Sequence, residues 1–134
     1  MRNVLILGGE KKFEELASKL KSRGYNVMIP FVKDAEDYKD YLDEESLLIS
    51  TKKGLEVVFK VLNKKVKGAF FVMDKDYDLA SLKGYANKFF IYIQKDDKDI
   101  NATANYLETE TMVIEDEDEL IEEVLIDIIS LEHS

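Results

Sequence analysis

The chain has 134 residues, of which 46% are apolar and 35% charged, and its formal net charge is −9. One globular domain spanning residues 1–134, with a sizeable core, fits this length and composition. The acidic balance argues against binding to nucleic acid or to anionic membranes, since both attract basic surfaces. No apolar run approaches the ~18 residues of a membrane span and the N-terminus lacks signal-peptide organisation, so we expect a cytoplasmic protein.

Two residue types that carry much enzyme chemistry are scarce in this chain. Cysteine is absent, which excludes disulfides, thiolate nucleophiles and cysteine metal sites. The single histidine, His133, lies one residue from the end of the sequence. We therefore expect no histidine-based triad and no metal site, and we expect no cofactor.

The first thirty residues predict a buried strand, a helix and a second strand. Asn3 to Gly9, NVLILGG, is an apolar run that stops at two glycines. Glu10 to Arg23 follows with the i, i+3, i+4, i+7 spacing of an amphipathic helix, at Phe13, Leu16, Ala17 and Leu20. Gly24 ends this helix, and Tyr25 to Ile29 is the second predicted strand, which Pro30 stops.

The middle of the chain predicts helix and then a third strand. Asp34 to Ser50 is acidic and aromatic, and we interpret most of it as helix with a break near its end. Thr51 is placed to cap a second helical piece with apolar residues at Leu55, Val58, Phe59 and Leu62. Lys67 to Asp74, KGAFFVMD, predicts a strand buried on both faces, and Lys75 to Asp78 predicts a loop.

The last third predicts two more strands and a terminal helix. Leu79 to Lys88 is a short predicted helix, and Phe89 to Gln94, FFIYIQ, is the fourth predicted strand. Asp99 to Leu107 fits either a short helix or an irregular connection. Thr111 to Ile114 is the fifth predicted strand. Asp116 to Leu131 is a helix with an apolar stripe and an acidic first turn, which suits the helix dipole.

Strands and helices alternate throughout this pattern, which predicts an α/β fold. Right-handed crossovers then give a three-layer sandwich, with a five-stranded parallel sheet covered by helices on both faces. We expect the flavodoxin-like strand order 2-1-3-4-5. In that order the first and third predicted strands are neighbours at the switch point, so the loops that follow them face one crevice.

The first of these loops supplies Gly8, Gly9 and Glu10. The two glycines allow a ligand to approach the backbone, and they open a helix N-terminus, which attracts anions. The dinucleotide fingerprint G-x-G-x-x-G and the P-loop pattern are both absent. A tight strand-to-helix turn without a ligand is the alternative interpretation.

The second loop supplies three alternating carboxylates, Asp74, Asp76 and Asp78. The sequence D-K-D-Y-D lacks the glycine and the distant glutamate of a calcium-binding EF-hand. Asp76 and Asp78 are candidate catalytic acids or bases, with a purely structural role as the alternative. Tyr77, and further along Tyr85 and Tyr92, are candidates for stacking on a base, although a tyrosine in such a domain also packs in the core.

Five segments follow one another along the chain: LILGG (5–9), GYNVMIP (24–30), GAFFVMDKDYD (68–78), LKGYANK (82–88) and FFIYIQKDD (89–97). In order and spacing they resemble the nucleoside 2-deoxyribosyltransferases and their relatives. The resemblance implies the α/β fold, a nucleoside or nucleotide ligand and a homo-oligomer. The two loops and these tyrosines make Gly8, Gly9, Glu10, Asp74, Tyr77 and Tyr85 the candidate ligand-binding residues.

The chain departs from this family at the position of its nucleophile. The family has a glutamate two residues before Gly-Tyr-Ala, and alignment on Gly84-Tyr85-Ala86 puts Leu82 there. A glycosidic-bond enzyme needs a carboxylate at the reacting centre, so Asp76 or Asp78 would have to take its place.

Three functions therefore stay open, and the sequence does not decide whether the protein is an enzyme. The first is binding of a nucleoside or nucleotide without the family's nucleophile. The second is cleavage or transfer at an N-glycosidic bond through Asp76 or Asp78. The third is a protein-interaction or regulatory module that uses the acidic segment Asp34 to Glu45 or the final helix as its contact surface.

Overall fold

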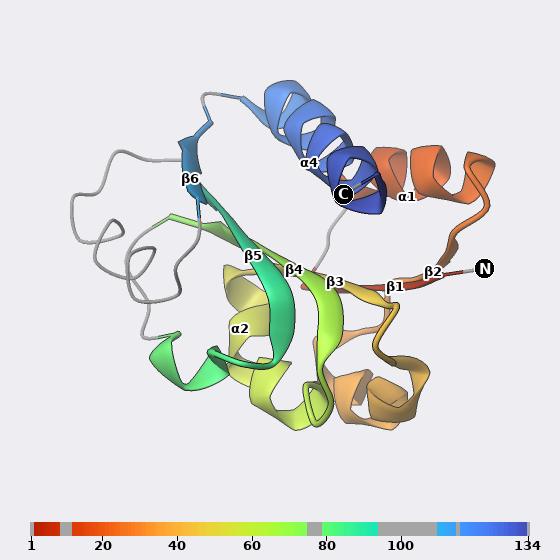
Figure 1. Cartoon of the computed structure of the whole chain (residues 1–134), viewed down its shortest axis with the longest axis vertical. Helices are drawn as coiled ribbons and strands as arrows, with labels where there is room; N and C mark the ends of the chain where they lie inside the picture. Colours follow the sequence, from red (N-terminus) through yellow and green to blue (C-terminus); the bar gives the residue numbers. More distant parts are fainter. Residues whose placement is uncertain (1, 9–11, 75–78, 94–109, 115, 134) are drawn as a thin grey trace.

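The computed structural model describes residues 2–8, 12–74, 79–93, 110–114 and 116–133. From β1 to β5 strands alternate with helical segments, as Figure 1 shows. The elements are β1 (Asn3–Leu7), α1 (Lys12–Ser22), β2 (Asn26–Met28), the 3-10 helix η1 (Val32–Tyr41), β3 (Leu47–Thr51), α2 (Lys52–Val61), β4 (Val66–Met73), the 3-10 turn η2 (Ala80–Leu82), β5 (Ala86–Ile93), β6 (Glu110–Val113) and α4 (Glu117–Glu132).

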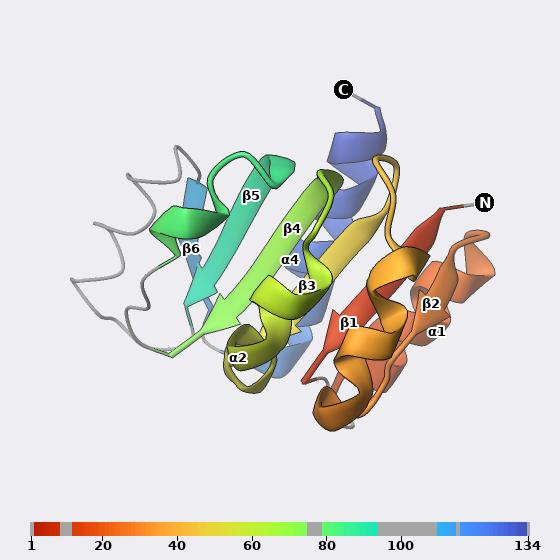
Figure 2. The same cartoon turned by 90° about the horizontal axis from the view of Figure 1, so that it is seen from below.

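The strands form one parallel sheet in the order β2-β1-β3-β4-β5-β6. Helices α1 and α4 cover one face of the sheet, and η1 and α2 cover the other (Figures 1 and 2). The predicted α/β class, the parallel sheet with helices on both sides and the flavodoxin-like order are confirmed. The sheet has six strands rather than the five that we expected, because β3 is an additional strand.

The extra strand lies inside the segment that we expected to be helical. Of the predicted helix Asp34 to Ser50, only η1 is helical, and Leu47–Thr51 pairs with β1 on one side and β4 on the other. All five residues of β3 are buried. A short run of apolar residues carries no period that distinguishes a helix from a strand, and a strand buried on both faces is apolar throughout.

A second predicted helix is also wrong. Within Leu79 to Lys88 only the 3-10 turn at Ala80–Leu82 is helical, and β5 already begins at Ala86. The segments Lys75 to Asp78 and Asp99 to Leu107 lie outside the described residues. In the described part of the chain, no helix combines the length and the apolar character that crossing a membrane requires.

Both faces of the sheet carry a hydrophobic layer, which explains the continuous apolar runs of its strands. In β1, Val4 and Ile6 pack toward α1 and α4, whereas Leu5 and Leu7 pack toward η1 and α2. Aromatic pairs link β4 to β5 on both faces, with the rings of Phe70 and Phe90 4.7 Å apart and those of Phe71 and Phe89 6.0 Å apart. Alternate side chains thus enter opposite layers of the core.

Helix α4 begins with a side-chain cap. The Oδ1 atom of Asp116 accepts a hydrogen bond of 2.8 Å from the backbone N–H of Glu119. The helix then buries Leu120, Ile121, Val124 and Ile128 against the sheet. Its cap and its apolar stripe are both local features of the sequence, so α4 was predictable to within one residue at each end.

We expect Asp116→Ala to lower the free energy of unfolding by about 1 kcal/mol, because the N–H of Glu119 loses its partner. Chemical denaturation of the purified protein measures this loss. Asp118→Ala is the matched control, since it removes an exposed acid from the same helical turn without removing the cap. Equal losses in the two variants would show that charge near the helix N-terminus, and not the hydrogen bond, stabilises α4.

Candidate functional site

The carboxyl edge of the sheet contains the switch point of this fold. Residues after β1 lead into α1 on one face, and residues after β3 lead into α2 on the opposite face. In open α/β sheets, ligands bind in the crevice where such connections diverge. The neighbour of β1 at this point is β3, so our expectation that β1 would adjoin the strand ending at Asp74 is wrong. That strand, β4, lies one position further along the sheet.

Thr51 connects the end of β3 to the turn after β1. Its Oγ1 atom donates a hydrogen bond of 2.9 Å to the backbone carbonyl of Gly8, and this hydroxyl lies 3.5 Å from the carbonyl of Leu7. Thr51 stands at the N-cap position of α2, as predicted, but its side chain makes no capping hydrogen bond there. The hydroxyl holds the β1 turn in place instead of the first turn of α2.

Gly8 is required by the close packing of this turn against α2. Its φ is +69°, in the left-handed region that favours glycine. A Cβ at this position would lie 2.3 Å from Oγ1 of Thr51 and 2.6 Å from the backbone nitrogen of Gly54. A Cβ at Gly54 would in turn lie 2.6 Å from the Cβ of Leu7. The two glycines let the first turn of α2 lie directly against the end of β1.

Lys52 extends the connection to the next strand. Its Nζ atom forms an ion pair of 2.8 Å with Oδ2 of Asp74, the residue that directly follows β4. The Lys52 side chain is 54% exposed and that of Asp74 is 25% exposed. Gly8, Thr51, Lys52 and Asp74 thus form a continuous polar connection across the carboxyl ends of β1, β3 and β4.

The structure places the predicted site residues in different parts of the sheet. Gly8 and Asp74 lie at the same edge, joined through Thr51 and Lys52 rather than by direct contact. Tyr85 does not reach this edge. It lies in the turn before β5, where its carbonyl accepts a hydrogen bond from Val66, so it is at the amino edge of the sheet. The other predicted site residues lie outside the described residues: Gly9, Glu10, Asp76, Tyr77 and Asp78.

Tyr92 is buried in the hydrophobic core. It is buried between the sheet and α4, and its hydroxyl donates a hydrogen bond of 2.6 Å to Oδ2 of Asp127. Burial raises the pKa of Tyr92, and the neighbouring carboxylate of Asp127 raises it further. The hydroxyl therefore stays protonated and serves as a structural donor.

Sequence reasoning missed Thr51 and Lys52 as members of this site. A signal was present, because LLISTKKG repeats the arrangement of LILGGEKK: an apolar run, a small or hydroxyl residue, and then a charged helix start. The second of these patterns indicates that a strand ends and a helix begins near Thr51. Among the described residues, no group of three or more acidic or histidine side chains is placed to hold a metal ion.

Comparisons of the chain with protein-family models, with curated proteins and with solved structures each return no match. The resemblance to nucleoside 2-deoxyribosyltransferases therefore has no support beyond the parallel α/β fold. The local structure also differs from that resemblance. Leu82, which aligns with the family's nucleophile, is only 1% exposed, and Gly84-Tyr85-Ala86 forms a turn and a strand start instead of a helix. What the observations show is a flavodoxin-like α/β fold.

We expect Gly8→Ala to destabilise the protein by about 3 kcal/mol, since strain at positive φ adds to a clash with Thr51 and Gly54. Gly24→Ala is the matched control. Its φ is +93°, but a Cβ there meets no atom within 4 Å, so we expect a loss of only about 1 kcal/mol. Denaturant unfolding of both variants measures the difference. Equal losses would show that Gly8 does not pack closely against α2.

Proposed function

We propose that the protein binds a small nucleoside monophosphate at the carboxyl edge of β1, β3 and β4. The observation that carries this function is the polar connection from Gly8 through Thr51 and Lys52 to Asp74. It lies at the switch point, where folds of this topology place their ligands. Its members are held by neighbouring strands, so a ligand would meet groups that are already positioned.

Lys52 is the group that best suits the phosphate. It is exposed, it lies in the first turn of α2, and the N-terminal end of a helix favours an anion. Its ion pair with Asp74 holds the ammonium group at the edge of the sheet. A phosphate oxygen would share this ammonium group with Asp74.

Asp74 suits the sugar of the same ligand. A carboxylate accepts hydrogen bonds from hydroxyl groups, and Asp74 directly follows β4 at the edge where the phosphate would bind. The described residues at this edge include no nucleophile paired with a general base, because the hydroxyl of Thr51 is buried and donates to Gly8. We therefore propose binding as the function, and cleavage of an N-glycosidic bond by Asp76 or Asp78 stays a separate hypothesis.

Titration of the isotopically labelled protein with nucleosides, deoxynucleosides and their monophosphates tests this function. We expect saturable shifts of backbone amides at Gly8, at Thr51 to Gly54 and at Asp74. Lys52→Ala should weaken monophosphate binding about tenfold, because a charge-assisted hydrogen bond is lost, and should leave nucleoside binding nearly unchanged.

Lys60→Ala is the control for that titration, since it removes an exposed lysine from the last turn of the same helix. Similar weakening by both substitutions would contradict a specific contact at Lys52. An absence of saturable shifts at these residues with every compound would rule out the binding function. Free base released in the same samples would instead support the glycosidic-bond hypothesis.

A protein-interaction module is the second candidate, and one observation favours it. Phe31 is 76% exposed at the start of η1, with Nζ of Lys33 5.8 Å from its ring centroid. The helix that follows carries four acids, at Asp34, Glu36, Asp37 and Asp40. An exposed aromatic ring beside charged groups is typical of residues that dominate protein interfaces.

If Phe31 is an interface residue, Phe31→Ser should reduce capture of a stoichiometric protein partner at least about tenfold. Ile126→Ser is the control, because it replaces an exposed apolar residue on α4, at the other face of the sheet. Affinity purification with quantitative mass spectrometry measures the capture. A partner lost equally in both variants, or lost on Asp74→Asn, would contradict the assignment to Phe31.

A further inference from the structure

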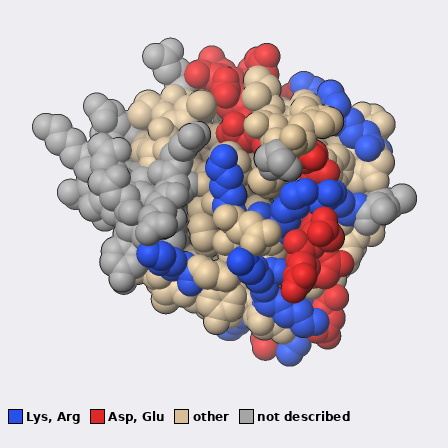
Figure 3. Space-filling view, viewed as in Figure 1, with Lys and Arg blue, Asp and Glu red and all other residues tan. Residues whose placement is uncertain are grey.

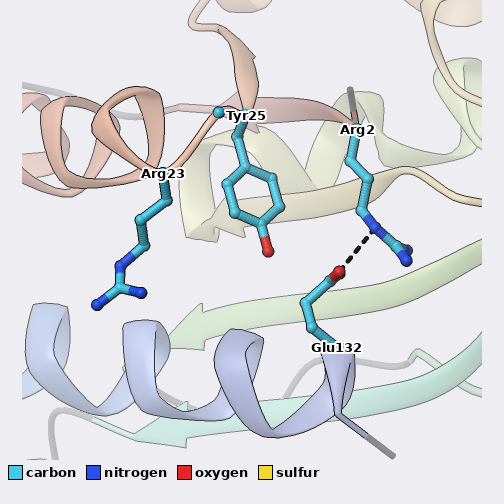
Figure 4. A pocket seen from close by; sticks show the side chains of 5 residues that line it. Arg2, Arg23, Tyr25 and Glu132 are labelled. Atoms are coloured by element: carbon cyan, nitrogen blue, oxygen red, sulfur yellow. Dashed lines mark ion pairs between the residues drawn. The ribbon is translucent and has the colours of Figure 1, made fainter.

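A hollow of about 270 Å³ opens at the amino edge of the sheet, opposite the proposed nucleotide site. Its lining comes from three parts of the chain, and the residues are Arg2, Arg23, Gly24, Tyr25 and Glu132 (Figure 4). Arg2 precedes β1, the residues from Arg23 to Tyr25 connect α1 to β2, and Glu132 ends α4. The parallel sheet brings these chain segments together because strand starts and helix ends share one edge.

Arg2 and Glu132 form the fixed wall of the hollow. The Nε atom of Arg2 lies 2.7 Å from Oε2 of Glu132, and its Nη1 atom lies 2.9 Å from Oε2 of Glu45. Nζ of Lys67 lies 4.0 Å from Oε1 of Glu132, an atom that is closed to solvent. Two cations therefore balance Glu132, and its carboxylate is not available to a cationic ligand.

Arg23 and Tyr25 supply donors that face the same space. In Figure 4 the Arg23 side chain extends toward α4, and the hydroxyl of Tyr25 points between the two arginines. Arg23 is exposed, and no ion pair joins it to another residue within the described ranges. Burial raises the pKa of Tyr25, and the charge of Glu132 and a hydrogen bond to its carboxylate raise the pKa further, so the hydroxyl stays protonated.

The local charge is positive although the protein as a whole is acidic. Figure 3 shows acidic side chains gathered over the first turns of α4, whereas basic and acidic side chains lie next to one another near its C-terminal end. Around the hollow, three cations face two acids: Arg2, Arg23 and Lys67 against Glu45 and Glu132. Among these described residues, one positive charge is left without an acidic counterpart, and Arg23 carries it.

We propose that this hollow binds a small molecule through an oxyanion group, either a carboxylate or a phosphate. The guanidinium fork of Arg23 matches both groups with two parallel hydrogen bonds, and the Tyr25 hydroxyl becomes a third donor when its hydrogen rotates from Glu132 to the ligand. The volume lies just below the ~300–1,000 Å³ of pockets for drug-sized ligands, so the ligand is a compact metabolite. This site is independent of the nucleotide-binding function proposed above.

Two probes test this site on the full chain, inorganic phosphate and succinate, each at constant ionic strength so that general screening does not change. We expect saturable shifts of the Gly24 and Tyr25 backbone amides with at least one probe. Arg23→Ala should weaken that binding at least about tenfold, and Arg23→Lys should weaken it less, because charge is kept while the fork is lost. Tyr25→Phe should weaken probe binding several-fold, because one hydrogen bond to the ligand is lost.

Lys21→Ala is the matched control, since it removes the same charge from the end of α1 outside the hollow. We expect it to change the affinity by less than about twofold. Lys52→Ala should leave the response of Gly24 and Tyr25 unchanged, which separates this site from the nucleotide site. Circular dichroism confirms that each variant is folded before its affinity is compared.

The probes also identify the chemistry of the ligand. Saturation with phosphate alone assigns the hollow to phosphoryl compounds, and saturation with succinate alone assigns it to carboxylates; saturation with both supports the shared oxyanion chemistry. Shifts that stay linear with both probes would overturn the site. Equal losses in Arg23→Ala and Lys21→Ala would overturn it as well, because they would show attraction by general charge and not by a built pocket.

Discussion

The burial of β3 between β1 and β4 is the constraint on which the rest of the fold depends. All five residues from Leu47 to Thr51 are buried, and the strand pairs with a neighbour along both sides. Without it, β1 and β4 would present unpaired backbone groups inside the protein, at a high cost in free energy. Because β3 separates β1 from β4, it also determines which connections lie next to one another at the carboxyl edge and at the amino edge of the sheet.

The placement of β3 explains the construction of the carboxyl edge. Thr51 ends the strand and uses its hydroxyl to hold Gly8, and Lys52 follows it and reaches Asp74. The last residue of β3 and the first residue of α2 therefore join β1, β3 and β4 through polar side chains. The arrangement requires glycine at positions 8 and 54, since any Cβ there would meet the backbone or side chains of the opposing element.

The two edges of the sheet differ in what they offer to a ligand. At the carboxyl edge an exposed ion pair, Lys52 with Asp74, lies beside the start of α2. At the amino edge Arg2 is held by two acids and shapes a hollow into which Arg23 and Tyr25 bring donors. The net negative charge of the chain does not predict the local charge at either edge, because local charge depends on which side chains the fold brings together.

The sequence by itself determined the elements with a clear local pattern: the strand Asn3–Leu7, the helix that follows it, the apolar strand ending at Met73 and the final helix with its apolar stripe. It also determined the α/β class, since strands and helices alternate. Only the tertiary structure decided that Leu47–Thr51 is a strand between β1 and β4, because its apolar run of three residues has no period of its own. It likewise decided that Tyr85 lies away from the switch point and that Arg2 meets Glu132. Periodicity specifies which face of an element is buried, and long-range pairing alone specifies which residues become neighbours.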